Sequence, residues 1–188
     1  MITHKGTRTL HTNRLTLRKF TPEDAQQMYD NWASDERVTR HLTWEPHSSL
    51  EDSKKLLENW CILYDFPHYY NWGIELSGEL IGNISAVQFN EACESCEIGY
   101  CLAYEMWNKG IMSEALQRVV SYFFEEIGVH RITIKHKKEN PASGKVAQKC
   151  GFAYEGTARE AYKKADGTFA DIVSYSLLRQ EYEARKKS

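Results

Sequence analysis

The chain has 188 residues, with 24 Lys and Arg against 26 Asp and Glu, so its formal net charge is −2. With 41% hydrophobic residues this length supplies one sizeable core but not two, and we expect a single domain over residues 1–188. The near-neutral charge excludes a nucleic-acid binder that works by a bulk basic excess. No apolar run suits a membrane span or a signal peptide, so we expect a cytoplasmic protein without a membrane partner.

The first third of the chain predicts one strand and two helices. Residues 14–19 alternate polar and apolar side chains as a half-buried strand does. Thr21 then offers an N-cap, and the proline and two acidic residues that follow it suit the first turn of a helix. Ser48 and Glu51 have the spacing of a capping box for a second helix, which is expected to end before Pro67.

The middle of the chain predicts a meander of strands. Ser77 and Gly78 form a two-residue hairpin signal between strands at residues 70–76 and 79–89. A further strand is expected at residues 94–103, where apolar side chains again alternate with polar ones.

The last part of the chain predicts two more helices. From residue 111 the apolar period changes from two to about 3.6, which indicates a helix over residues 111–127 that Gly128 closes. Asn140 and Pro141 provide a cap and a first-turn proline for a short helix that Gly151 stops. The remaining segments are expected to be strands at residues 131–135, 152–161 and 171–178 and a frayed charged tail at residues 184–188. Together they predict a mixed α/β (α+β) domain.

A strand, a glycine-bearing turn and a long helix follow one another over residues 97–115. Gly110 allows the backbone to approach an anion closely, and the free N–H groups and the dipole of the helix N-terminus attract negative charge there. Lys109 adds a full positive charge. A lone glycine is better explained by a tight turn, so this segment predicts a phosphate site only if a second signal accompanies it.

Residues 139–152 carry that second signal. Together the two segments resemble the GNAT family of acetyl-CoA-dependent N-acetyltransferases, whose later motif reads N-x-x-(S/A)-x-x-(V/L)-x-x-(K/R)-x-G-F. Every position of the motif is matched, by Asn140, Ser143, Val146, Lys149, Gly151 and Phe152. The resemblance extends over about residues 10–180 and includes the order of the elements. It therefore implies a mostly antiparallel sheet of about seven strands, with splayed central strands and about four flanking helices.

Other segments are similar to one branch of that family, the RimJ/RimL-like ribosomal-protein N-terminal acetyltransferases, which include ribosomal-protein-alanine acetyltransferase. The similarity lies in residues 13–18, in the Thr-Pro-Glu-Asp turn that begins at Thr21, and in residues 107–116. Two positions depart from the usual cofactor loop. Trp107 stands where many members carry Gln or Arg, and Met112 stands where Gly or Ala is usual.

The resemblance implies a binding site for acetyl-CoA as co-substrate, without a metal. The backbone of Tyr100, Cys101 and Leu102 would pair with the pantetheine arm. The pyrophosphate would lie in a cradle formed by Asn108, Lys109, Gly110, Ile111, Met112 and Ser113. Asn140 would bond the pantetheine, Ser143 would lie near the thioester sulfur, and Lys145 or the run at residues 135–138 would meet the 3′-phosphate.

Acetylation of an amine requires the neutral form of that amine. An α-amino group with a pKa of about 8 is roughly a tenth neutral at pH 7, whereas fewer than about one lysine side chain in a thousand is neutral. A protein N-terminus, such as that of a ribosomal protein, is therefore the first choice of acceptor. The alternatives are a small amine (a polyamine, an amino acid or an antibiotic) and a non-catalytic acyl-CoA-binding module. Either a monomer or a homodimer is compatible with the sequence.

Two residues are candidates for catalysis. Glu97 is expected to act as the base, directly or through a water, if burial in the cleft raises its pKa, although a surface carboxylate would explain it equally well. Ser143 is expected to donate to the departing thiolate, with water as the alternative donor. A backbone N–H near Leu102 would bind the oxyanion. Cys101 is better explained as a small core residue than as a nucleophile.

The remaining expectations concern the acceptor. Aromatic residues at 41–47 and 64–72 lie in loops, where binding residues concentrate, and are candidates for the wall of the acceptor site. Because a chain of net charge −2 does not attract anionic CoA globally, we expect positive charge at the cofactor site. If the acceptor is a basic protein tail, we also expect acidic charge around the acceptor.

Overall fold

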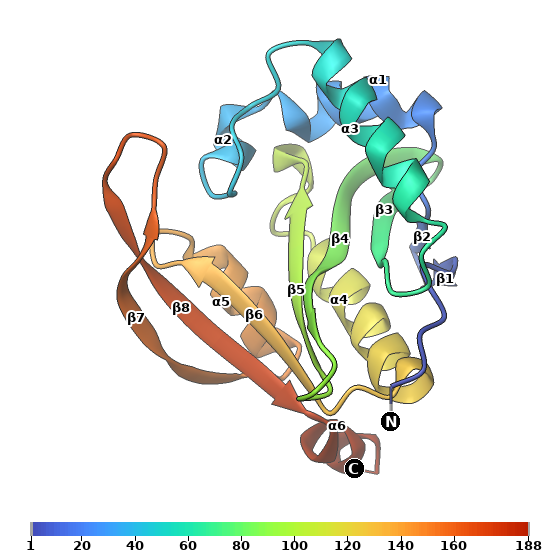
Figure 1. The fold of residues 1–188 in the computed structure, drawn as a ribbon, viewed down its shortest axis with the longest axis vertical. Coiled ribbons are helices and arrows are strands. Elements are labelled where there is room, and N and C mark those ends of the chain that lie inside the picture. The colour runs from blue at the N-terminus through green and yellow to red at the C-terminus, as the bar shows by residue number, and fades with distance from the viewer. Residues whose placement is uncertain (1, 188) are drawn as a thin grey trace.

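The computed structural model describes residues 2–187 and arranges eight strands of that region in one sheet (Figure 1). The strands are β1 (Leu10–His11), β2 (Leu15–Arg18), β3 (Asn71–Leu76), β4 (Glu79–Asn90), β5 (Ser95–Leu102), β6 (Arg131–Lys137), β7 (Ala153–Lys163) and β8 (Phe169–Leu178). Their order is β1-β2-β3-β4-β5-β6-β8-β7, and neighbours are antiparallel except for β5 and β6. The predicted mixed, mostly antiparallel sheet is confirmed. The additional strand is β1, which is too short to show an alternating pattern.

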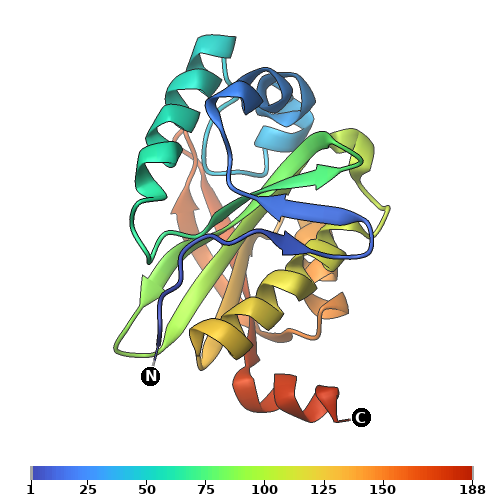
Figure 2. The same ribbon diagram turned by 90° about the vertical axis from the view of Figure 1, so that its right-hand side faces the viewer.

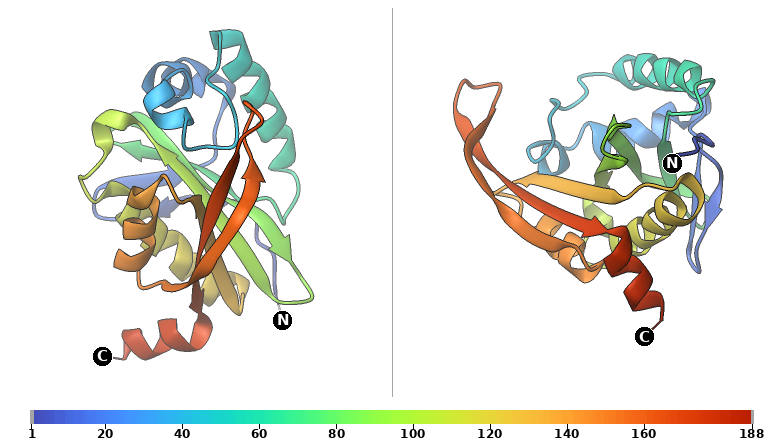
Figure 3. Two further views of the ribbon diagram at one scale, coloured as in Figure 1. Left: turned by 90° about the vertical axis from the view of Figure 1, so that its left-hand side faces the viewer. Right: turned by 60° about the horizontal axis from the view of Figure 1, so that its bottom comes forward.

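The α-helices of the described residues are α1 (Ala25–Met28), α2 (Glu36–Thr39), α3 (Leu50–Leu63), α4 (Ile111–Tyr122), α5 (Pro141–Lys149) and α6 (Arg179–Lys186). Beside them are two 3-10 helices, η1 (Pro22–Asp24) and η3 (Tyr104–Met106), and two π-helical segments, η2 (Tyr29–Ala33) and η4 (Phe123–Ile127). Figure 2 shows α3 and α4 on opposite sides of the sheet. Figure 3 shows the twisted β7–β8 hairpin, whose tip extends beyond the end of β6.

Each face of the sheet buries its own core. Helix α4 covers one face, where Tyr70, Trp72, Tyr122 and Phe123 pack their rings edge to face at centroid distances of 5.0–6.3 Å. The helical segments from α1 to α3 cover the other face with a second cluster around Trp32. Most of the aromatic residues in the first half of the chain therefore serve the cores.

One helix end agrees with the sequence and one cap is shifted. Gly128 ends the α4–η4 helix in the left-handed conformation with φ of 91°, as predicted. The capping box of α3 is formed by Ser49 and Asp52, one residue later than the predicted Ser48 and Glu51. Both registers satisfy the spacing, but the Asp52 carboxylate reaches the backbone N–H groups of both serines at 3.0 Å, which fixes the later register.

The sequence did not predict α2 or α6. Helix α6 continues through Lys186, where a frayed tail was expected from residue 184. Tyr182 of α6 stacks on Phe124 at a centroid distance of 5.0 Å, and Lys186 pairs with Glu125 at 2.7 Å. These partners lie near the end of α4, far away in sequence, so no local pattern marks the helix.

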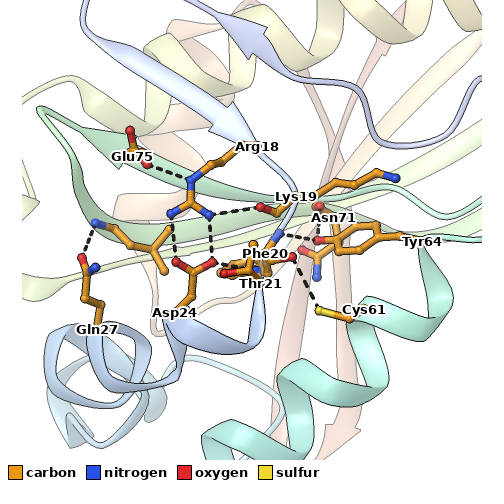
Figure 4. Close-up of polar contacts among 11 residues, drawn as sticks. Arg18, Lys19, Phe20, Thr21, Asp24, Gln27, Cys61, Tyr64, Asn71 and Glu75 are labelled. Atoms are coloured by element: carbon orange, nitrogen blue, oxygen red, sulfur yellow. Dashed lines mark hydrogen bonds and ion pairs between the residues drawn. The ribbon is translucent and has the colours of Figure 1, made fainter.

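An ion-pair cluster holds the helical cover against the sheet (Figure 4). Arg18 of β2 donates to both carboxylate oxygens of the buried Asp24 at 2.8 and 2.9 Å and to Glu75 of β3 at 2.7 Å. Tyr64 at the end of α3 accepts the N–H of Phe20 and donates to the carbonyl of Asn71. Arg18 belongs to the family-like segment at residues 13–18, and Asp24 belongs to the Thr-Pro-Glu-Asp turn. Their ion pair gives both segments a structural role.

Strands β5 and β6 part within the sheet. Their parallel pairing runs from Ser95 opposite Arg131 to Glu97 opposite Thr133 and ends there, whereas β4 continues to pair with β5 as far as Leu102. Figure 1 shows the two strands diverging beyond this point. The predicted splay is confirmed, and it frees one backbone edge of β5 just before α4 begins.

Candidate functional site

A cavity of about 380 Å³ opens where β5 and β6 part. Its walls come from β5, from η3, from the first turns of α4 and α5, and from α2 and the turn after it. The lining contains most of the residues that the resemblance assigns to acetyl-CoA, namely Tyr100, Cys101, Leu102, Asn108, Gly110, Ile111, Met112, Ser113, Asn140, Ser143 and Lys145. Lys109 and Glu97 are the two predicted site residues outside this lining.

The N-terminus of α4 forms an anion cradle. Gly110 is its N-cap, in the left-handed conformation with φ of 74°, and Asn108 before it has φ of 60°. A β carbon on Gly110 would lie 3.8 Å from Nη2 of Arg14 and 3.9 Å from Nζ of Lys149, so two cations flank the turn. The first-turn N–H groups and the dipole of α4 add positive potential. These groups fit the pyrophosphate of CoA.

Arg14 is held in that cradle by two other bonds. Its Nε donates to the Glu114 carboxylate at 2.7 Å, and its Nη1 donates to the carbonyl of Lys109 at 3.2 Å. The sequence showed Arg14 and Glu114 only as parts of family-like segments and Lys149 only as a motif match. Their meeting at Gly110 depends on the packing of β2 and α5 beside α4, which no local pattern reports.

The lysines of residues 109 and 135–138 have other surroundings. The Lys109 side chain is exposed, with its Nζ 4.0 Å from the Met106 sulfur. Lys135 pairs with Glu97, Lys138 pairs with Asp171, and Lys137 donates to two backbone carbonyls. Lys145 and Lys149 are therefore the lysines of the cavity lining.

The two unusual residues of the cofactor loop have structural roles. The Trp107 indole N–H donates to the carbonyl of Leu102 at 2.8 Å, and its ring packs on Tyr104 at a centroid distance of 5.0 Å. Trp107 thereby ties the turn back to β5. Met112 is buried in the core beneath α4. Both residues also belong to the cavity lining beside Gly110.

Helix α5 presents Ser143 to the cavity. The Asn140 side chain caps the helix by accepting the N–H of Ser143 at 3.4 Å. The hydroxyl of Tyr100 lies 3.0 Å from Oγ of Ser143 and 3.2 Å from its carbonyl oxygen. Burial raises the pKa of Tyr100 far above its usual range, so the phenol is protonated near neutral pH.

Glu97 lies at the fork rather than in the cavity. It occupies the last paired position of β5, and its carboxylate accepts from Nζ of Lys135 at 2.6 Å. The expected burial in the cleft is therefore absent, and a base role requires Lys135 to move aside or a water to bridge.

Cys101 is a buried residue of the core. Its Sγ donates to Oδ1 of Asn83 at 2.8 Å, and burial raises the pKa of the thiol to about 12. A thiol of this kind is almost wholly protonated at neutral pH and is a poor nucleophile. The sequence interpretation of Cys101 as a small core residue agrees with this placement.

The opposite wall of the cavity comes from α2 and the turn after it. Val38, His41 and Leu42 line this wall. Trp44, the aromatic residue expected there from the loop at residues 41–47, packs on the core cluster around Trp32 instead. Burial, and then the neighbouring Arg40, lower the pKa of His41, so its ring is neutral near pH 7. Within the described residues 2–187, the loop at residues 64–72 contributes nothing to the lining. Tyr70 and Trp72 from that stretch are core residues instead.

Lys137 fastens this wall to β6. Its side chain is 9% exposed, and Nζ donates to the carbonyls of Leu42 at 2.7 Å and Arg40 at 3.4 Å. The ammonium also lies 4.8 Å from the centre of the Tyr162 ring. A buried ammonium with carbonyl and aromatic partners is satisfied without a carboxylate.

Charge is divided between two hollows. Lys145 and Lys149 line the cavity, and no carboxylate of the described residues 2–187 does so. A smaller hollow of about 140 Å³ on the other side of Met106 is lined by Asp30, Asp35, Glu79, Glu105 and Arg37. The cavity lining therefore has the expected positive charge, and the acidic charge expected around the acceptor stays a prediction.

Other kinds of site were sought in the same part of the chain. Among residues 2–187, no helix combines the length and the apolar character needed to cross a membrane. Nor do three or more His, Cys, Asp or Glu side chains of these residues gather as metal ligands.

Comparison with known proteins gives a consistent result. The family profile described as "Acetyltransferase (GNAT) domain" matches residues 14–153. The uncharacterized N-acetyltransferase YoaA of Bacillus subtilis is 35% identical over 172 residues, which are 90% of this chain and 96% of YoaA. The ribosomal-protein-serine acetyltransferase of Escherichia coli is 32% identical over 75% of this chain and 83% of its own. The spermidine N(1)-acetyltransferase of Vibrio cholerae is 23% identical over 93% and 99%.

Solved structures have the same fold. A GNAT-family acetyltransferase from Bacillus anthracis superposes with a TM-score of 0.81 and 26% identity, covering 93% of this chain and all of its own. RimL, the ribosomal L7/L12 α-N-protein acetyltransferase in complex with coenzyme A, superposes with a TM-score of 0.83 at 22% identity, over 93% of this chain and 99% of its own.

Proposed function

The chain belongs to the GNAT family and is an acetyl-CoA-dependent N-acetyltransferase, and we propose that its acceptor is the α-amino group of a protein N-terminus, with ribosomal proteins as the first candidates. The relative named ribosomal-protein-serine acetyltransferase supports this choice, because its sequence aligns with 75% of this chain at 32% identity. A protein N-terminus also offers far more neutral amine near pH 7 than a lysine side chain does.

The observation that carries the proposal is the charge of the cavity lining. Lys145 and Lys149 are there without any carboxylate, and Val38, Leu42 and Met106 form an apolar wall, among the residues that the structure describes. A polyamine brings two or more further positive charges, which require carboxylate partners when water is removed. An N-terminal amine beside an uncharged side chain has no such requirement.

The residues then have separate roles in transfer. Arg14, Lys149 and the first turn of α4 hold the pyrophosphate, and the free edge of β5 at Tyr100–Leu102 positions the pantetheine arm. Lys145 serves the 3′-phosphate. Glu97 removes the surplus proton of the amine through a water, and Ser143 donates a hydrogen bond to the departing sulfur.

The acceptor proposal is tested with matched peptides. One peptide has a free N-terminus and acetylated lysines, and the other has an acetylated N-terminus and free lysines. CoA thiol release and peptide mass are measured for both, and for spermidine. We expect turnover with the free N-terminus alone. Turnover only with spermidine would establish the small-amine alternative, and binding of acetyl-CoA without turnover on any amine would establish a non-catalytic module.

The base assignment has its own test. Glu97→Gln should lose turnover while it retains acetyl-CoA affinity, and the acidic limb of its pH–rate profile should change. Glu58→Gln, an exposed change on α3, is the matched control and should leave the profile intact. An unchanged profile in Glu97→Gln would show that another group accepts the proton.

The organisation and location of the protein are part of the same proposal. We take residues 1–188 as one acetyltransferase domain, because the family profile spans residues 14–153 and the solved relatives extend over almost the whole chain. A ribosomal-protein acceptor would place its work in the cytoplasm, as a monomer or a homodimer.

A further inference from the structure

Tyr100 and Ser143 form a hydrogen-bonded pair on the wall of the cavity. Both residues line the cavity, and the phenol oxygen lies 3.0 Å from Oγ of Ser143. The same phenol lies 3.2 Å from the carbonyl oxygen of Ser143. Tyr100 comes from β5 and Ser143 from α5, so the pair also joins two of the elements that line the cavity.

The number of protons limits the pair to two arrangements. Each hydroxyl has one proton and can accept other hydrogen bonds. In the first arrangement Tyr100 donates to the carbonyl of Ser143, and the hydroxyl of Ser143 donates to Tyr100. In the second, Tyr100 donates to Oγ of Ser143, and the Ser143 proton is free to point into the cavity. The two differ only in the rotation of hydroxyl hydrogens.

Negative charge in the cavity selects the second arrangement, because a thiolate requires a donor. Burial keeps Tyr100 protonated, so the phenol supplies a hydrogen bond and does not give up its proton. The Ser143 hydroxyl can turn its proton towards the thiolate without any movement of heavy atoms, so the hydrogen bond forms at little reorganisation cost.

We propose that Tyr100 is a positioning residue, which directs the hydroxyl proton of Ser143 towards the sulfur of CoA and so stabilises the departing thiolate. Ser143 donates as the carbon–sulfur bond breaks and its electron pair remains on sulfur, while the new carbon–nitrogen bond forms and the surplus proton of the amine leaves to the base. The thiolate is protonated by solvent afterwards. The inference rests on the role proposed for Ser143 and not on the identity of the acceptor.

The thiol of bound CoA provides a test that needs no acceptor. Its ionisation on the protein is followed by the ultraviolet absorbance of the thiolate during a pH titration with CoA. In the wild type we expect the pKa of the bound thiol to lie below that of free CoA by about one unit, the size expected for a hydrogen bond to a charged group. Ser143→Ala should abolish the shift.

Tyr100→Phe keeps the ring and removes the hydroxyl. It should abolish about half of the pKa shift, because the Ser143 hydroxyl remains as a donor but is no longer oriented by Tyr100. In the Ser143→Ala background the same change should have no effect, because Tyr100 acts through Ser143. Tyr104→Phe removes a hydroxyl from the neighbouring turn η3 and should preserve the wild-type shift.

Two results would overturn the inference. One is a pKa shift of the bound thiol in Tyr100→Phe that equals the wild-type shift, which would show that Tyr100 only packs against Ser143. The other is an equal effect of Tyr100→Phe with and without Ser143, which would show that the two residues act independently. Failure of the wild type to bind CoA would instead contradict the cofactor site, and failure to acetylate peptides would contradict the acceptor proposal alone.

Discussion

The two sides of the cavity are built in different ways. The cofactor side consists of contiguous segments, residues 108–113 and 140–149, whose glycine, caps and helix N-termini are determined by neighbours in sequence. The opposite wall, formed by α2 and the turn after it, is the one that we propose for the acceptor (the acceptor side), and long-range contacts assemble it. The clearest are those of Lys137 with the carbonyls of Leu42 and Arg40, 95 and 97 residues away. The two helix N-termini of the cofactor side are thus encoded locally, whereas the proposed acceptor side depends on how distant segments pack.

The largest effect is expected for Arg18→Leu, which removes the cation from the cluster that holds the acceptor-side helices. Asp24 is only 5% exposed and would lose its charged partner. Removal of one member of a buried ion pair typically costs about 3–5 kcal/mol. Urea unfolding should show a loss of roughly this size, with loss of acceptor turnover before loss of CoA binding.

Arg37→Leu is the matched control for that change. Arg37 pairs with Asp35 at the surface, where an ion pair contributes less than about 1 kcal/mol. Equal losses of stability in the two variants would show that the Arg18 cluster is not what holds this side of the molecule.

The cofactor side is tested next by Lys149→Ala. Loss of one charge-assisted contact to a phosphate corresponds to about 1.5–3 kcal/mol, so the Kd for CoA should rise by about tenfold or more. The difference should shrink as salt is added. Lys55→Ala, which removes the same charge from α3, should leave the Kd unchanged. Calorimetry measures both, and an unaltered Kd in Lys149→Ala would remove this lysine from the phosphate site.

A smaller effect, confined to the acceptor, is expected for Lys137→Met. Without the two carbonyl contacts the turn at residues 40–42 loses its attachment to β6, and the acceptor KM should rise severalfold while the Kd for CoA stays within about twofold. An equal rise in the acceptor KM and in the Kd for CoA would show that the two sides of the cavity are not independent.

Lys137 also predicts a direction for the pH dependence of stability. Burial, and then the charge of Lys164, lower the pKa of Lys137 below its ordinary 10.5. Between the lowered value and 10.5 the unfolded chain binds more protons than the folded one, so this residue's contribution favours folding increasingly as pH rises. Thermal unfolding at a series of pH values should show the stability of the wild type rising relative to that of Lys137→Met as the pH approaches 10.5. A relative stability that falls with pH would contradict this assignment.

The smallest effect is expected for Cys101→Ser. With a thiol pKa of about 12, Cys101 contributes no thiolate at neutral pH, so turnover should remain within about twofold. Alkylation near pH 7 should modify the exposed Cys93 first and leave Cys101 unmodified. Rapid inactivation by modification of Cys101 would show that the thiol is more reactive than its surroundings imply.

The sequence predicted the cofactor side well for a physical reason. Gly110, Asn140 and Pro141 act on the backbone within one or two turns, so their meaning is visible without tertiary structure. Tyr100 was predicted to contribute only its backbone, because its side-chain bond to Ser143 joins residues 43 positions apart. Arg14 was missed as a phosphate neighbour for the same reason.

The sequence was less informative about the acceptor side. Helix α2 has only four residues, and its cap at Asp35 resembles many turn signals. Glu97 was expected to be buried in the cleft, but its ion pair with Lys135 on the neighbouring strand depends on the register of β5 against β6. Such pairings are decided by the fold and leave no local pattern in the chain.

Amide hydrogen exchange with and without CoA tests the placement of the cofactor most directly. At residues 100–102 strand β5 pairs with β4 but no longer with β6, and the first-turn N–H groups at residues 110–113 have no acceptor within the helix, so bound CoA should slow exchange at both places. Residues 50–63 of α3 and 153–163 of β7 should exchange as before. Slower exchange confined to α3 or β7, with no change at residues 100–102 and 110–113, would contradict a cofactor site between the parted strands.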